Sequence, residues 1–169
     1  MSEKEFLNIV LPFKDKLYRL ALQYLISKDS AEDATQEIIY KLWKNKTKIS
    51  SYKNVEAFAM TMTKNYCLDQ LKSKNSNNLK LVHSNYTDAN SSLDKNMEVN
   101  DSVNIIKQLI NGLPKKQRII IQLRDVEQYT FEEIGKILGL KQTAIRVALS
   151  RARKTIREKI TEKHNYGIN

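Results

Sequence analysis

Residues 141–159 constrain the fold more than any other part of the chain, because their apolar and basic residues follow the same helical period. The stretch reads KQTAIRVALSRARKTIREK. Apolar residues recur at steps of four, three and four, the spacing of one helical face: Ile145, Leu149, Ala152 and Ile156. Polar residues recur at the same steps one position later: Arg146, Ser150, Arg153 and Arg157. The pattern predicts a helix with one face buried in a core and a basic face beside it.

The residues before this stretch indicate a short helix followed by a tight turn. Thr130 and Glu133 have the spacing of a capping box, in which each side chain accepts a hydrogen bond from the backbone N–H of the other residue. Gly139 suits the left-handed conformation that ends many helices. We therefore expect a helix over 131–138 and a second helix from about Gln142. This succession is typical of a helix-turn-helix.

Apolar residues elsewhere in the chain also follow helical spacing. A first helix is expected from about Phe6 to Tyr24, with Pro12 marking a kink or a restart. A second is expected to begin at Ser30. A third is expected from about Asn54 to Lys72, with an apolar inner side: Val55, Phe58, Ala59, Met62 and Tyr66. Only four Gly and two Pro occur, which argues against a turn-dense β protein.

The second half of the chain carries two further helix signals and a boundary before them. Asn111-Gly112 marks a helix end, and Pro114 is expected at the first position of the next helix. In residues 73–101, Ser and Asn fill 12 of 29 positions, too polar a composition to offset the cost of ordering the chain. The predicted fold class is all-α, with two small helical domains joined by a flexible linker and a helix-turn-helix in the second. The expected boundaries are a first domain over 1–75, a linker over 76–101, a second domain over 102–163 and a tail over 164–169.

The net charge of +10 favours a polyanionic partner. The excess lies mainly in residues 102–169, which contain 14 Lys and Arg against 6 Asp and Glu. Lysine-rich helices can also serve solubility, so charge alone leaves nucleic-acid binding open.

Few residues of the chain suit metal or redox chemistry. Cys67 is the only cysteine, which excludes an intrachain disulfide and a cysteine-based zinc site. His83 and His164 have no metal-ligand spacing around them. We therefore expect no metal and no cofactor. No apolar stretch approaches the ~20 residues that span a bilayer, so we expect no membrane insertion and a cytoplasmic location.

Residues 113–158 carry a resemblance to a known family. They read LPKKQRIIIQLRDVEQYTFEEIGKILGLKQTAIRVALSRARKTIRE. The LPxxQR opening, the EEIGKILGL middle and the LSRARK end resemble, in order, the fourth conserved region of bacterial RNA polymerase sigma factors of the sigma-70 family, extracytoplasmic-function (ECF) type. In that family this region reads the minus-35 promoter element, so the resemblance implies recognition of duplex DNA.

The second helix of this motif supplies the candidate minus-35 residues. Gln142, Thr143 and Arg146 occupy its first turns, where recognition helices contact base edges. Later residues are expected at phosphates: Ser150, Arg151, Arg153, Lys154 and Arg157. A solvated arginine face is the plainer interpretation of any one of these signals. Their combination at helix-turn-helix spacing favours DNA binding.

Two stretches of the first domain are similar to the second conserved region of the same family. DSAEDATQEIIYKLW, residues 29–43, resembles its core-binding helix, and VEAFAMTMTKNYCLDQLKSK, residues 55–74, resembles the segment that melts and captures the minus-10 strand. The implied partners are core RNA polymerase, through its β′ clamp helices and β flap, and promoter DNA. An anti-sigma factor is a further candidate partner, because such inhibitors are common in this family.

These stretches supply two further sets of candidate site residues. The candidate minus-10 residues form a polar side of the third helix: Thr61, Lys64, Asn65, Asp69 and Lys72. An ordinary solvated face is the alternative for this set. The candidate core-binding residues lie opposite the apolar side of the second helix: Asp33, Gln36, Glu37, Tyr40 and Lys41. An acidic patch on a basic protein suits a positively charged protein partner better than DNA.

The recognition helix departs from the family pattern. Many relatives have Thr-Val-Lys-Ser-Arg where this chain has Ala144 to Ala148. Val147 and Ala148 have no side-chain hydrogen-bond donor, so we expect base reading to shift toward Gln142, Thr143 and Arg146, with a contribution from DNA shape. Phe58 and Ala59 stand where Trp-Leu is frequent.

Two other classes of function stay open at this point. An enzyme is disfavoured, because no phosphate-binding glycine loop, metal cluster or Ser/His/Asp arrangement is visible. A helix-turn-helix regulator acting as a dimer without polymerase would predict an inverted-repeat operator and tight binding alone. We predict instead a non-enzymatic sigma factor that directs promoter-specific initiation, reading the minus-10 element as single strand and the minus-35 element as duplex.

Overall fold

A computed structural model describes residues 1–78 and 101–166, and all regular structure in these residues is helical. This confirms the predicted all-α class. The chain divides into two compact units, which are described one at a time. The predicted linker over 76–101 falls almost entirely outside the described residues. Within them, no helix combines the length and apolarity needed to cross a bilayer.

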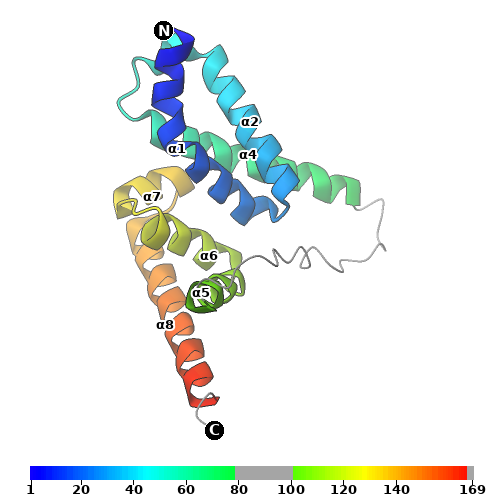
Figure 1. Ribbon diagram of the computed structural model, residues 1–169, viewed down its shortest axis with the longest axis vertical. Coiled ribbons are helices and arrows are strands. Elements are labelled where there is room, and N and C mark those ends of the chain that lie inside the picture. The colour runs from blue at the N-terminus through cyan, green and yellow to red at the C-terminus, as the bar shows by residue number, and fades with distance from the viewer. Residues whose placement is uncertain (79–100, 167–169) are drawn as a thin grey trace. The chain divides into compact units, whose positions relative to one another are not determined.

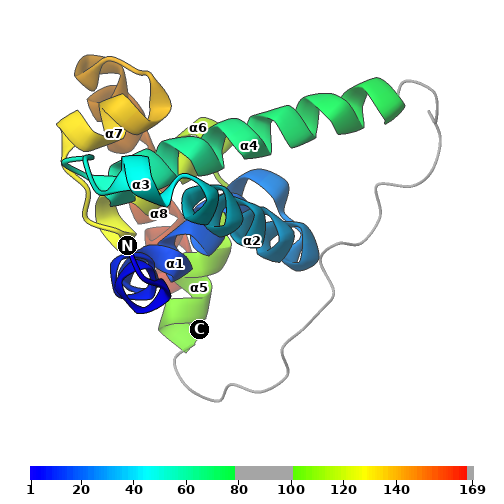
Figure 2. The same cartoon turned by 90° about the horizontal axis from the view of Figure 1, so that it is seen from above.

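Within residues 1–78, the first unit contains α1 (Glu3–Leu25), α2 (Lys28–Lys44), α3 (Lys46–Ile49) and α4 (Val55–Asn78), of which Figure 1 labels α1, α2 and α4. Helix α1 packs against both α2 and α4, and the short α3 leads from α2 toward the start of α4 (Figure 2). Their core is made of fully buried apolar residues, among them Leu17, Leu20, Ile38, Leu42 and Met60. Lys16 of α1 also donates to Glu56 of α4, with an Nζ–Oε1 distance of 2.7 Å.

Both α1 and α2 begin differently from the sequence expectation. Ser2 and Glu5 form a capping box at the start of α1, and the helix then continues through Pro12 without a restart. Helix α2 begins earlier than predicted, because Ser27, not Ser30, is its cap. The Ser27 backbone is extended, and its hydroxyl accepts a hydrogen bond from the Ser30 N–H at 3.3 Å.

The inner side of α4 differs from the predicted one. Its buried residues are Ala59, Met60, Thr63 and Cys67, whereas Phe58 is 39% exposed and Tyr66 is half-buried. Thr63 can lie in the core because its hydroxyl donates to the Ala59 carbonyl at 2.8 Å, which satisfies the polar group inside the helix. Ala59 was predicted correctly, and Val55 and Met62 are half-buried, but the placement of Phe58 was wrong because the prediction excluded Thr63 from the core and thereby rotated the helix.

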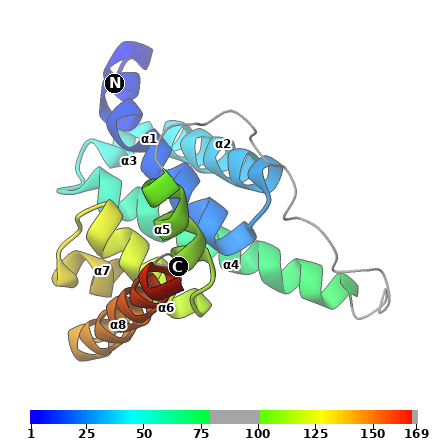
Figure 3. The same cartoon turned by 60° about the horizontal axis from the view of Figure 1, so that its bottom comes forward.

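The second unit combines several short helices with a long one: α5 (Asp101–Asn111), α6 (Lys115–Ile121), the π-helical turn η1 (Gln122–Val126), α7 (Phe131–Leu138) and α8 (Gln142–Tyr166). Figure 3 shows α8 as one long helix, coloured orange to red, that ends near the C-terminus. Helix α6 packs against α8, and α5 contacts both. Pro114 is the residue that precedes α6, so its predicted place as first helical residue was wrong by one position.

The helix-turn-helix signals are confirmed. The Glu133 N–H donates to the Thr130 hydroxyl at 3.1 Å, and the Thr130 N–H donates to the Glu133 carboxylate at 2.8 Å. Gly139 has φ +67° and ψ +34°, the left-handed conformation that favours glycine. Gly135 allows close packing across the turn, because a Cβ there would lie 3.0 Å from the Leu140 carbonyl oxygen.

The π-helical turn η1 was not predicted. The Glu127 N–H donates to the carbonyl of Gln122, five residues earlier, at 3.0 Å. Gln128 then adopts φ +63°, and Arg124 donates from Nη1 to the Tyr129 carbonyl at 2.8 Å. The Gln122 amide donates to the Glu127 carboxylate at 3.2 Å, so these two buried polar side chains satisfy each other. This turn therefore carries the chain from α6 into the helix-turn-helix.

Candidate DNA-binding and partner-binding surfaces

Helix α8 has the two faces that its sequence predicts. Ile145, Leu149 and Ala152 are at most 2% exposed, and burial of the two large side chains contributes about 1.5–3 kcal/mol each. All candidate minus-35 side chains are exposed: Gln142, Thr143, Arg146, Ser150, Arg151, Arg153, Lys154 and Arg157. The buried face thus anchors the helix and leaves a polar, basic face open to solvent.

Phe131, the first residue of α7, positions two guanidinium groups. The Arg146 guanidinium lies 5.0 Å from the centre of the Phe131 ring, and that of Arg124 lies 4.5 Å from it. Such cation–π contacts restrict a long side chain without removing its charge. Phe131 also lines a hollow of about 290 Å³ along α8, together with Arg146, Leu149, Ser150, Arg153 and Arg157. This basic hollow brings together residues predicted at bases and residues predicted at phosphates.

Arg153 is held by an acidic partner. It donates to Asp125 from Nε at 3.0 Å and from Nη2 at 2.5 Å, a bidentate geometry. These hydrogen bonds raise the pKa of Arg153, so its guanidinium stays protonated. Lys154 lies 3.9 Å from Glu158 in a more exposed pair. The side chains that are predicted at phosphates therefore differ in how firmly they are held within the protein. Arg153 is the most restricted of them.

A second hollow, of about 540 Å³, lies between the start of α6 and α8. It is lined by Pro114, Lys116, Gln117, Thr143, Ala144, Val147, Ala148 and Arg151. Val147 is 48% exposed, although its side chain is apolar and its neighbours on the helix are basic. One apolar side chain, that of Val147, thus occupies the middle of the face that is expected to meet DNA.

The candidate minus-10 residues lie along α4. Asn65, Asp69 and Lys72 are exposed, whereas Thr61 and Lys64 are half-buried. The Thr61 hydroxyl donates to the Ala57 carbonyl at 3.0 Å, so its donor is already used within the helix. Asn65, Asp69 and Lys72 are therefore the members of this set with fully open side chains.

An exposed aromatic pair at the start of α4 was missed. The rings of Tyr52 and Phe58 are 4.7 Å apart, and each residue is 39% exposed. The sequence signal for this pair was an aromatic residue on each side of Asn54. Asn54 caps α4, because its side chain accepts a hydrogen bond from the Ala57 N–H at 2.9 Å. The pair went unrecognised because Phe58 was assigned to the core.

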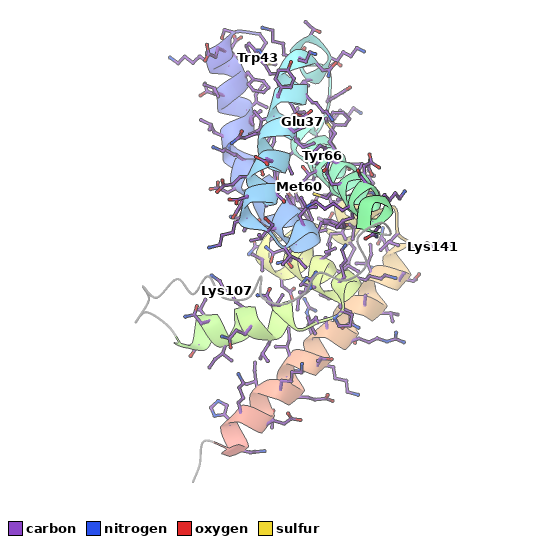
Figure 4. The ribbon with its side chains drawn as sticks, turned by 90° about the vertical axis from the view of Figure 1, so that its right-hand side faces the viewer. Glu37, Trp43, Met60, Tyr66, Lys107 and Lys141 are labelled. Carbon is purple, nitrogen blue, oxygen red and sulfur yellow. The ribbon has the colours of Figure 1, made fainter. Side chains whose placement is uncertain are left out.

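The candidate core-binding residues form a surface on α2 that extends to α4. Asp33, Gln36 and Tyr40 are exposed, and Glu37 and Lys41 are half-buried. Lys41 lies between Glu37, at 3.6 Å, and the Tyr66 ring, at 5.2 Å from its centre. Figure 4 shows Glu37 and Tyr66 on these neighbouring helices. Tyr66 was predicted in the core, but it belongs to this surface.

The charges of this surface affect the pKa of Tyr66. Burial raises the pKa of its hydroxyl first, followed by the negative charge of Glu37, then Cys67 and Asp33. The surface is therefore acidic at its centre, with Lys41 as a neighbouring cation. Among residues 1–78 and 101–166, no three His, Cys, Asp or Glu side chains gather as they would around a metal ion.

Comparison with known proteins identifies both units. The Sigma-70 region 2 family model matches residues 9–77, and the Sigma-70, region 4 family model matches residues 104–156. Together they cover most of the chain, which belongs to the sigma-70 family of transcription initiation factors. Within that family it is an ECF sigma factor, a factor for promoter-specific transcription initiation.

Individual relatives are distant in sequence. The ECF RNA polymerase sigma factor SigW of Bacillus subtilis is 24% identical over 178 residues, which cover 95% of this chain and 91% of SigW. The ECF sigma factor SigE of Mycolicibacterium smegmatis is 27% identical, over 89% of this chain and 60% of SigE. The sigma factor RpoE of Bartonella quintana, solved with the anti-sigma factor NepR, has the same fold, with a TM-score of 0.73 at 22% identity over 94% of this chain and 98% of RpoE.

Proposed function

We propose that this sigma factor binds core RNA polymerase through α2, captures the minus-10 element as single strand along α4 and docks the minus-35 element as duplex on α8. The observation that carries this proposal is the pair of faces on α8, one buried and one polar and basic. A recognition helix needs both, since it must be fixed to its domain while it enters the major groove.

The division of labour along α8 follows from position. Gln142, Thr143 and Arg146 lie in its first two turns, where side chains of a recognition helix reach base edges. Arg151, Lys154 and Arg157 lie further along and are placed for phosphates, which supply affinity without sequence preference. Phe131 supports the reading role of Arg146, because a stacked guanidinium is already oriented before DNA binds.

The minus-10 function is proposed for α4 and the segment before it. Asn65, Asp69 and Lys72 offer amide, carboxylate and ammonium groups in line, which suits base edges and the backbone of a single strand. The exposed pair of Tyr52 and Phe58 adds aromatic faces on which unpaired bases can stack. These features support opening of duplex DNA at this unit.

The polymerase contact is proposed for the acidic surface on α2. Asp33 and Glu37 present negative charge on a protein whose net charge is +10, so they favour a basic protein partner over DNA. We assign this surface to the β′ clamp helices, and the second unit to the β flap. An anti-sigma factor is proposed as a regulator, since RpoE of Bartonella quintana, which has the same fold, was solved in complex with the anti-sigma factor NepR. The expected site of action is the cytoplasm, where the polymerase is.

In vitro transcription tests the proposal. Purified core RNA polymerase is incubated with the full chain and a genomic promoter library, and transcripts are sequenced. We expect promoter-specific transcripts only when both proteins are present. Absence of such transcripts, together with tight binding of the chain alone to an inverted repeat, would support the dimeric regulator instead.

A further inference from the structure

Val147 lies at the centre of the exposed face of α8. Successive residues of an α-helix are about 100° apart, which places Val147 nearly opposite the buried stripe of Ile145, Leu149 and Ala152. Its neighbours on the exposed face are Thr143, one turn earlier, and Arg151, one turn later. A helix that enters a groove with its buried side turned away therefore directs Val147 at the floor of the groove.

The hollow beside Val147 combines apolar side chains with two uncharged polar ones, Gln117 and Thr143, and two cations. Ala144, Ala148 and Pro114 line the adjoining hollow, and none of these side chains can donate or accept a hydrogen bond. Lys116 on α6 and Arg151 on α8 stand at the same hollow. Two cations beside the apolar Val147 suit duplex DNA. The cations can contact phosphates while the apolar side chain contacts the floor of the groove.

Only one base offers an apolar group to such a side chain. In the major groove, thymine exposes its 5-methyl group, whereas the edges of guanine, adenine and cytosine expose donors and acceptors. Val147 would leave those polar edges without partners, which disfavours them. We propose that Val147 is a specificity-determining residue that contacts the methyl group of a thymine in the duplex promoter element. This rests on the proposed function of α8.

The experiment uses deoxyuridine, which pairs like thymidine but lacks the methyl group. Promoters obtained from the transcription library are resynthesised with each thymine of the upstream element replaced in turn by deoxyuridine. Binding of the holoenzyme is then measured for each. We expect about a three- to fivefold loss of affinity at one thymine, the size expected for one buried methyl group.

Variants assign the contact to Val147. For Val147→Ala, the deoxyuridine substitution at that position is expected to have no further effect, because both changes remove the same contact. Val147→Ile keeps an apolar contact and is expected to retain the preference for thymine. Val126→Ala is the matched control, since Val126 is also 48% exposed but lies in η1. It is expected to keep the full deoxyuridine effect.

The outcomes separate this inference from the proposed function. If the wild-type holoenzyme gives no promoter-specific transcript, the proposed function and the contact of Val147 are both wrong. If it initiates specifically but no deoxyuridine substitution matters, or the element contains no thymine, the contact of Val147 is overturned and the sigma function stands. A deoxyuridine effect that persists in Val147→Ala assigns the methyl contact to another side chain and also overturns the inference.

Discussion

Arg153 and Asp125 form a bidentate ion pair that joins the middle of α8 to the turn η1. Asp125 lies 28 residues earlier in the chain, so the pair fixes the approach to the helix-turn-helix against its recognition helix. The same pair engages the guanidinium of Arg153, which is expected to lie near a phosphate of the DNA. One carboxylate thus both orders the unit and restrains a side chain that is proposed to contact DNA.

Asp125→Asn is expected to release Arg153 toward DNA. The pair is partly exposed, so its loss should change the free energy of unfolding by less than about 1 kcal/mol. Binding of the holoenzyme to promoter DNA should become more salt-dependent, with the slope of log K against log salt steeper by about one. Glu158→Gln is the control, because its pair with Lys154 is longer and more exposed. An unchanged slope for Asp125→Asn would show that Arg153 stays away from phosphate.

Arg146→Ala and Arg157→Ala should act differently, although both remove an exposed arginine of α8. Arg146→Ala is expected to cost about 1–3 kcal/mol on the cognate minus-35 element and to relax sequence preference. Arg157→Ala should weaken binding to all promoters alike and lower the salt slope by about one. Titrations of both holoenzymes against cognate and altered elements check this. Equal effects would contradict the assigned order of bases and phosphates along the helix.

The double substitution of Asp33→Lys with Glu37→Lys should abolish binding to core polymerase. It reverses the charge at the centre of the acidic surface, and neither side chain is buried, so the helix content should be unchanged. Pull-down with core polymerase and circular dichroism measure the two properties. Asp15→Lys with Glu3→Lys is the matched control, since both carboxylates are exposed and lie on α1, outside the proposed interface. Wild-type binding of core polymerase by Asp33→Lys with Glu37→Lys would exclude the acidic surface on α2 from the interface.

Tyr24 should make the first unit less stable at high pH. Burial, with a smaller effect from Cys67, raises the pKa of its hydroxyl to about 12. The folded state thus retains a proton that the unfolded state loses near pH 10, so stability is fully present below pH 10 and falls between about pH 10 and 12. Two pKa units correspond to about 2–3 kcal/mol.

Urea unfolding between pH 9 and about 12 tests this, because the slope against pH reports the difference in bound protons. Tyr24→Phe should remove part of the fall, since it has no hydroxyl to ionise. Tyr52→Phe, at an exposed ring, should retain the wild-type fall. If both variants follow the wild-type curve, the buried hydroxyl of Tyr24 does not control alkaline stability.

Sequence patterns predicted the second unit well because the residues that begin and end its helices act locally. Thr130, Glu133 and Gly139 act within a few residues of themselves, so their roles can be read without knowing the fold. Ile145 and Leu149 were assigned correctly because no polar residue interrupts their stripe. The paired faces of α8, on which the candidate minus-35 site rests, were therefore predictable from spacing alone.

Features that depend on satisfied polar groups were not predictable in this way. Thr63 lies in the core because its hydroxyl bonds to its own helix, and this moved Phe58 and Tyr66 to the surface. The pairing of Arg153 with Asp125 depends on η1, which turns the chain between them. Spacing along one helix does not report such contacts, since each requires a second element at a known distance.

The π-helical turn has a consequence for how this chain can vary. A hydrogen bond to the fifth preceding residue encloses one residue more than an α-helical turn, so η1 is a widened last turn of the helix that begins as α6. Removing one residue from 122–124 would restore α-helical bonding and rotate Asp125 by about 100° about the helix axis. Asp125 would then no longer face Arg153. The turn is therefore not expected to tolerate a single-residue deletion.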